Sequence, residues 1–169
     1  IMALTFTNKA AKEMTERISE IIGGGEAKNV TMGTFHSVFS RILRMNADRL
    51  GYPTNFTIYD TQDSKSLLKD IIKGFSLDDK AYKVSNIFGR ISSAKNNLIS
   101  PDSYASNPEI QQEDKMSKRP EIARIYKSYA TRCFNAGAMD FDDLLYQTNI
   151  LLRDFPEVLS YYQQKFKYV

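Results

Sequence analysis

The sequence has few of the residues on which several kinds of site depend. Its single cysteine, Cys133, excludes an internal disulfide, favours a reducing cytoplasm, and lies on a hydrophobic helical face that predicts an inert core thiol. Its single histidine, His36, has no second histidine or cysteine at ligand spacing, so we expect no metal there. No hydrophobic run approaches about 18 residues and the start at Ile1 lacks a basic flank, so we expect neither a membrane span nor a signal peptide. A net charge of only +3 is weak evidence for nucleic acid, which leaves local charge to decide.

The stretch Ala3–Ile22 changes its hydrophobic period in the middle. It begins with β-preferring residues and continues with hydrophobic residues spaced three and four apart. This predicts a strand that runs into an amphipathic helix, with an N-cap at Thr7 or Asn8. A second strand over Val30–Thr34 is also followed by a helix. Two consecutive βα units imply parallel strands, and open α/β sheets bind ligands at the carboxyl ends of such strands.

The rest of the chain is predicted to be mainly helical. The segment Ser100–Arg119 is rich in Ser, Pro, Asn and Gln and is predicted to be a linker or mobile loop. We therefore expect a mainly α chain in three parts, with residues 1–55 and 138–169 forming an incomplete α/β core and residues 56–137 forming an all-helical insertion. The unpaired strand edges of such a core favour self-association. Outside the loop, a short extended piece is expected over Phe56–Tyr59, helices over Asp60–Ile72, Ser85–Asn97, Pro120–Ala136 and Asp140–Leu152 and from Pro156, and a strand from Phe166.

Phe6 stands where the first strand meets a polar turn, and the residues alone leave two interpretations open. It could pack under the helix as a sheet residue, or it could be an exposed ring above a phosphate-binding turn. Proteins that bind single strands combine an aromatic ring for base stacking with amides, hydroxyls and a cation for phosphates. Under the second interpretation the contacting residues are Thr5, Phe6, Thr7, Asn8 and Lys9.

The window Lys80–Ser100 contains four cations and no Asp or Glu. It is either a solvated helical face or a face that contacts the phosphates of a duplex. Nothing in it reads base edges, so we expect no sequence specificity. The candidate donors are Lys80, Lys83, Ser85, Lys95 and Asn96.

Three acids at the start of a predicted helix could suggest a metal site. They are Asp140, Asp142 and Asp143. Acids at a helix start are commonly caps that the helix dipole favours, and no nuclease or phosphatase geometry can be assembled from these three. We therefore predict neither a metal ligand nor a catalytic residue in the chain.

Three strings of the sequence resemble the motifs of one enzyme family. TFTNKAAKEM (Thr5–Met14) resembles motif Ia of superfamily 1 DNA helicases of the UvrD, Rep and PcrA type, and TMGTFHS (Thr31–Ser37) resembles their motif Ib. AMDFDDLL followed by YYQQKFKYV is similar to the segment that leads into their motif II. The resemblance implies that RecA-like (P-loop NTPase) α/β segments flank the helical insertion. It also implies that Phe6 stacks on a base and that Thr34, His36 and Ser37 contact the DNA backbone, whereas we interpret Phe35 as a core residue.

The resemblance implies an ATP-dependent 3′–5′ DNA helicase that translocates on single strands and unwinds duplex, in repair or replication. DNA, single-stranded or at a junction with duplex, is then the partner, and ATP and Mg²⁺ are the cofactors of the parent enzyme. The chain contains no G-x-x-x-x-G-K-[ST] loop and no Asp-Glu pair after Val169, so we expect an internal segment that is inactive alone. Two alternatives stay open: the helicase part of a RecB/AddA-like helicase–nuclease subunit, and a non-catalytic nucleic-acid-binding module.

Overall fold

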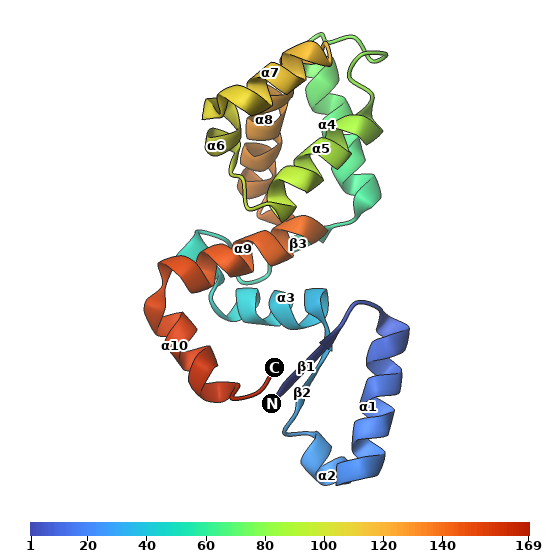
Figure 1. The fold of residues 1–169 in the computed structure, drawn as a ribbon, viewed down its shortest axis with the longest axis vertical. Coiled ribbons are helices and arrows are strands. Elements are labelled where there is room, and N and C mark those ends of the chain that lie inside the picture. The colour runs from blue at the N-terminus through green and yellow to red at the C-terminus, as the bar shows by residue number, and fades with distance from the viewer. The chain divides into compact units, whose positions relative to one another are not determined.

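The structure, a computed structural model, describes residues 1–169 and divides them into two compact units. Unit 1 comprises residues 1–54 and 147–169, and unit 2 comprises residues 55–146. Both units are mainly helical, and each contains one pair of short parallel strands (Figure 1). The mainly α fold with small α/β segments is thereby confirmed.

Unit 1 is built on two parallel strands, β1 (Met2–Thr5) and β2 (Thr31–Thr34). Helices follow both strands, so the two predicted βα units are present (Figure 1). The segment from Phe166 forms no strand, although the Met2 amide donates a hydrogen bond to the Tyr168 carbonyl at 2.9 Å. The helices of unit 1 are α1 (Asn8–Ile22), α2 (Gly24–Ala27), α3 (Phe35–Met45), the 3₁₀ helix η1 (Ala47–Leu50), the end of α9 (Phe141–Asp154), and α10 (Pro156–Lys165).

Unit 2 is a helical cluster with one small strand pair. Strand β3 (Thr57–Tyr59) pairs in parallel with β4 (Ala138–Asp140), a strand of three residues that the sequence pattern did not reveal. The core is hydrophobic and includes Leu68, Ile87, Ile125 and Cys133. The helices are α4 (Thr61–Gly74), α5 (Val84–Asn96), α6 (Pro101–Ser106), α7 (Pro108–Met116), α8 (Ile122–Asn135) and the start of α9.

The segment Ser100–Arg119 is not the loop that its composition predicts, because it contains α6 and α7. Ser100 accepts a hydrogen bond from the Ser103 amide at 3.0 Å, and Asn107 accepts one from the Glu109 amide at 3.0 Å. Each cap is followed by a proline at the first helical position, where proline is favoured. Ser-Pro and Asn-Pro are therefore helix starts here, although the same pairs also mark turns.

Cys133 is buried in the core of unit 2, as the sequence predicts. Burial, reinforced by the charge of Asp143, raises the pKa of its thiol to about 12. A thiol with so high a pKa carries almost no thiolate at neutral pH and is a poor nucleophile.

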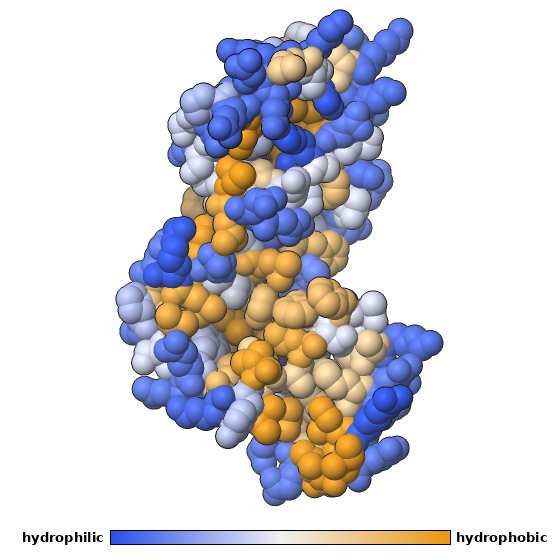
Figure 2. Space-filling model, viewed as in Figure 1, coloured by the Kyte–Doolittle hydropathy of each residue, from blue (hydrophilic) through white to orange (hydrophobic).

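Helix α1 is amphipathic, yet none of its residues is fully buried. Near its end, Ile21 is 81% exposed and Ile22 is 43% exposed. Figure 2 shows hydrophobic residues gathered on the surface of unit 1. The small sheet of unit 1 thus leaves part of the hydrophobic face of its first helix uncovered.

Candidate nucleic-acid interface

The turns after β1 and β2 lie at the same edge of the unit 1 sheet. The strands are parallel and in register, with Thr5 opposite Thr34. The segment Thr5–Lys9 therefore lies beside the start of α3, where His36 and Ser37 are found. A contact role was expected for Thr5–Lys9 from the residue pattern and for Thr34, His36 and Ser37 from the family resemblance. The fold brings the two segments together at the carboxyl ends of the strands, the position of ligand sites in open α/β sheets.

Side-chain caps open both helices at this edge. Thr7 Oγ1 accepts a hydrogen bond from the Ala10 amide at 3.1 Å, which confirms Thr7 as the N-cap of α1. Thr34 Oγ1 accepts one from the Ser37 amide at 3.2 Å, so α3 starts at Phe35. The first amides of two helices thus face the same edge, and helix N-termini attract phosphate because their N–H groups lack helical partners.

Phe6 is 84% exposed, so the interpretation that it packs under the helix is wrong. Its ring centre lies 5.1 Å from that of Phe35, with the planes tilted by 42°. Phe35, predicted as a core residue, is only half-buried, and its ring meets that of Phe39 edge-on at 5.9 Å. Phe6 is therefore open to solvent over most of its ring and contacts the half-buried Phe35 ring.

Gly33 also lies at this edge and is not among the predicted site residues. A Cβ at this position would lie 2.6 Å from Ser37 Oγ and 3.3 Å from Val38 Cγ2. A side chain at position 33 would therefore require Ser37 and Val38 to shift away from β2. A glycine inside a predicted strand is the available signal, since it often marks a close approach of two segments.

In unit 2, the five predicted duplex contacts do not form one cluster. Lys80, Lys83 and Ser85 are exposed around the start of α5, whereas Lys95 and Asn96 lie at its end. A helix of this length separates its two ends by roughly 15–20 Å at 1.5 Å per residue. The Asn96 side-chain amide already donates to the Ser92 carbonyl at 3.0 Å and to Asp142 at 3.3 Å.

Lys95 is only 3% exposed, which corrects its assignment as a surface donor. Its Nζ lies 2.7 Å from an Asp140 carboxylate oxygen and 2.8 Å from one of Asp143. The Tyr129 hydroxyl donates a third hydrogen bond to Asp140 at 2.8 Å. An ammonium held in this way cannot reach a DNA phosphate without breaking a buried ion pair, so we remove Lys95 from the duplex-contacting set.

The charges in this buried cluster shift one another's pKa. Burial alone would lower the pKa of Lys95, but Asp143 and Asp140 raise it above its usual value. Burial would raise the pKa of Asp140, but the Lys95 ammonium lowers it below the usual range. Burial raises the pKa of Asp143 to about 6, because one ammonium cannot fully compensate two buried carboxylates.

Asp140, the last residue of β4, and Asp142 and Asp143 of α9 do not form a metal site. The Asp143 amide donates to Asp140 at 2.8 Å and the Asp140 amide donates to Asp143 at 3.1 Å, which is a reciprocal cap. The interpretation of these acids as helix caps is thus confirmed for Asp140 and Asp143. No group of three or more His, Cys, Asp or Glu side chains in the chain could hold a metal ion. No helix is both long and hydrophobic enough to cross a membrane.

Comparison with known proteins identifies the family to which this chain is similar. The family model described as the UvrD/REP helicase N-terminal domain matches residues 1–169. The chain is 43% identical over 169 residues to the ATP-dependent DNA helicase PcrA of Staphylococcus epidermidis strain RP62A, and 41% identical to that of Staphylococcus aureus strain Mu50. Both alignments cover 100% of this chain and 22% of the relative, so the chain spans about a fifth of the length of these curated relatives.

Proposed function

The chain belongs to the UvrD/REP helicase N-terminal domain family, and on that premise we propose that it is the DNA-engaging part of an ATP-dependent DNA helicase. In this proposal the whole protein translocates 3′ to 5′ along one strand and unwinds duplex in the cytoplasm, during repair or replication. Unit 1 belongs to the RecA-like core and unit 2 is the helical insertion. The proposed boundary moves from residue 137 to residue 146, because β4 pairs with β3 inside unit 2.

The exposed ring of Phe6 is the observation that carries the proposal. It stands at an edge where two helix N-termini and several hydroxyl groups are also found. A base that stacks on Phe6 places its phosphates beside this polar edge, which is the combination that single-strand-binding sites use. The proposed phosphate contacts are Thr5, Thr7, Asn8, Lys9, Thr34, His36 and Ser37.

Unit 2 contributes contacts to duplex DNA in this proposal. Lys80, Lys83 and Ser85 are all exposed to solvent. Such contacts neutralise phosphates but read no bases, so they position a duplex without selecting its sequence.

ATP and Mg²⁺ are proposed as cofactors of the whole protein, but the residues of this chain do not fit them. The chain has no lysine-bearing phosphate loop of the G-x-x-x-x-G-K-[ST] type. Its buried carboxylates already have protein partners: Asp140 and Asp143 are paired with Lys95, and Asp114 is paired with Arg90 and Tyr104. We therefore derive no chemical step from these residues.

Self-association of the isolated chain is a further part of the proposal. The sheet of unit 1 has only two strands, and Ile21 is 81% exposed beside it. Unpaired strand edges and exposed hydrophobic side chains favour contact with another copy. Sedimentation of the chain as a monomer at concentrations of about 100 μM would contradict this part.

The test replaces Phe6 and measures affinity for a fluorescent single-stranded oligonucleotide. Phe6→Leu should weaken binding roughly 5- to 150-fold, because stacking contributes about 1–3 kcal/mol per base. Phe6→Tyr keeps a ring and should bind like the unmodified chain. Tyr168→Ala, which removes another exposed ring of unit 1, is the matched control and should have no effect.

Thermal melting separates the proposal from a structural role. An exposed side chain contributes little to folding, so Phe6→Leu should melt close to the unmodified chain. Undiminished single-strand affinity of this variant would refute the stacking assignment. In the whole protein, DNA-dependent ATP hydrolysis without unwinding would favour a translocating module over a helicase, and nuclease activity would favour the helicase–nuclease alternative.

A further inference from the structure

Two segments of unit 2 lie side by side at one end of its helices. They are the loop Phe75–Lys83, between α4 and α5, and the turn Ser117–Glu121, between α7 and α8. The Glu121 amide donates a hydrogen bond to the hydroxyl of the buried Tyr82 at 3.2 Å. The Arg124 guanidinium lies 4.0 Å from the centre of the Phe75 ring. These contacts hold the two segments together.

The exposed positive charge of unit 2 is distributed differently from what the sequence window indicates. Two of the four cations in the window Lys80–Ser100 are held in ion pairs, since Arg90 lies 2.8 Å from Glu113 and Lys95 is buried. Lys80 and Lys83 remain exposed on the loop. The adjacent turn adds Lys118 and Arg119, whose side chains form no ion pair or hydrogen bond.

Of the acidic groups near these four cations, Glu113 and Asp114 line the same cavity as Arg119 but are both paired with Arg90. Asp78 accepts a hydrogen bond from the Lys80 amide at 3.0 Å, and Glu121 lies 3.5 Å from Arg124. Asp79 is the remaining acid of the loop. The turn Ser117–Glu121 has a net charge of +1, and the longer stretch of residues 115–124, with four cations and one acid, has a net charge of +3.

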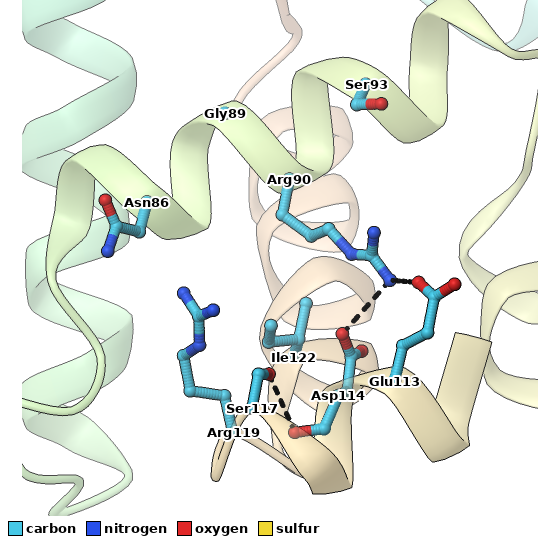
Figure 3. A pocket seen from close by; sticks show the side chains of 9 residues that line it. All are labelled: Asn86, Gly89, Arg90, Ser93, Glu113, Asp114, Ser117, Arg119 and Ile122. Carbon is cyan, nitrogen blue, oxygen red and sulfur yellow. Dashed lines mark hydrogen bonds and ion pairs between the residues drawn. The ribbon is translucent and has the colours of Figure 1, made fainter.

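Arg119 reaches from the turn into a cavity of about 500 Å³ between α5 and α7. Figure 3 shows its side chain extending toward the part of α5 that carries Asn86, while the Arg90 guanidinium turns away to Glu113 and Asp114. The cavity thus contains one compensated guanidinium and one that is free. A free guanidinium beside an exposed amide is suited to a phosphate oxygen.

Lys118 has a backbone conformation that favours glycine. Its φ is 57°, in the left-handed region, directly after the end of α7. The Arg119 amide donates to the Asp114 carbonyl at 2.8 Å and the Lys118 amide to the Lys115 carbonyl at 2.9 Å, which closes the helix end. Glycine is the usual residue at this position. Replacing Lys118 by glycine therefore removes the charge without straining the backbone.

We propose that Lys118 and Arg119, together with Lys80 and Lys83, form a patch that binds the phosphate backbone of duplex DNA. This patch, the four-cation patch, rests on the proposed function and adds two residues to it. Neither segment offers an aromatic ring for a base, because Tyr82 is buried and Phe75 is covered by Arg124. Cations without stacking platforms suit a duplex rather than a single strand.

The test uses Lys118→Gly, which removes the charge and suits the backbone. The matched control is Ser76→Gly, because Ser76 has φ 54° at the end of α4 and carries no charge. Both variants should unfold at the same or higher denaturant concentration than the unmodified chain. Only Lys118→Gly should bind a 20-base-pair duplex more weakly, roughly 5- to 10-fold at about 0.1 M salt, with a salt slope smaller by about 0.9.

Further variants make the outcomes decisive. Arg119→Gln should reduce the salt slope by a similar amount. Its control is Lys127→Gln, which removes the same charge at a site already paired with Asp102 and should reduce the salt slope less. This inference would be overturned if Lys118→Gly and Arg119→Gln left the salt slope of duplex binding unchanged. If replacing both Lys80 and Lys83 by alanine still lowered that slope, the proposed function would remain intact. An equal loss of affinity for a single-stranded oligonucleotide would overturn the assignment to duplex.

Discussion

Replacing Lys95 by methionine should destabilise the chain strongly. Methionine fills a similar volume, so the change removes the ammonium and leaves little cavity. Asp140 and Asp143 then face each other in a buried site without the cation that lies 2.7 Å and 2.8 Å from them. Removing one partner of a buried ion pair costs about 3–5 kcal/mol, because the remaining charge is uncompensated. We expect a loss of this size in the free energy of unfolding.

Urea unfolding followed by far-ultraviolet circular dichroism measures this loss. The matched control is Lys83→Met, which removes an exposed cation next to the same helix and should change the unfolding free energy by less than about 0.5 kcal/mol. A Lys95→Met variant that unfolds like the unmodified chain and binds duplex DNA as weakly as Lys83→Met would refute the buried ion pair. That outcome would identify Lys95 as the surface donor that the charge window suggests.

Three further outcomes follow from the same structure. Because burial raises the pKa of Asp143 from 3.8 to about 6, its contribution to stability is full below pH 3.8 and is lost as the pH rises through 6. Stability should therefore fall as the pH rises from 4 to 7, and this fall should be smaller in Asp143→Asn; urea unfolding that shows the same pH dependence for the variant and the unmodified chain would contradict the shift. The purified chain should hydrolyse no ATP with or without DNA, and a phosphate-release assay showing DNA-stimulated turnover would exclude this. The Cys133 thiol should react with a disulfide reagent only at the rate of unfolding, and reaction of the folded chain within seconds would show that it is accessible.

The sequence predicts the parts of this fold that depend on neighbouring residues. The period change before Thr7 and the polar residue that caps α1 are local features, and both are found in the structure. The helices α6 and α7 were missed because Ser100 and Asn107, each followed by proline, have the composition of a loop and the geometry of a cap.

The partners of distant residues could not be read from local pattern. Lys95 is buried because Asp140, 45 positions further along the chain, meets it in the fold, and no charge window contains that information. Strand β4 has three residues and becomes a strand only by pairing with β3, far earlier in the chain. The sequence does not decide whether Phe6 is exposed, because a ring at the end of a strand can either pack under the following helix or point into solvent.

The most direct test of the central claim is to locate the aromatic residue that stacks on a base. A single-stranded oligonucleotide carrying 5-iodouracil can be crosslinked to the chain by light and the modified peptide identified by mass spectrometry. We predict an adduct on Phe6, which is 84% exposed at the shared edge of β1 and β2, and its loss in Phe6→Leu. An unmodified Phe6 peptide at saturating oligonucleotide, with adducts on Tyr161 of α10 or on unit 2 alone, would contradict the claim that this edge binds the single strand.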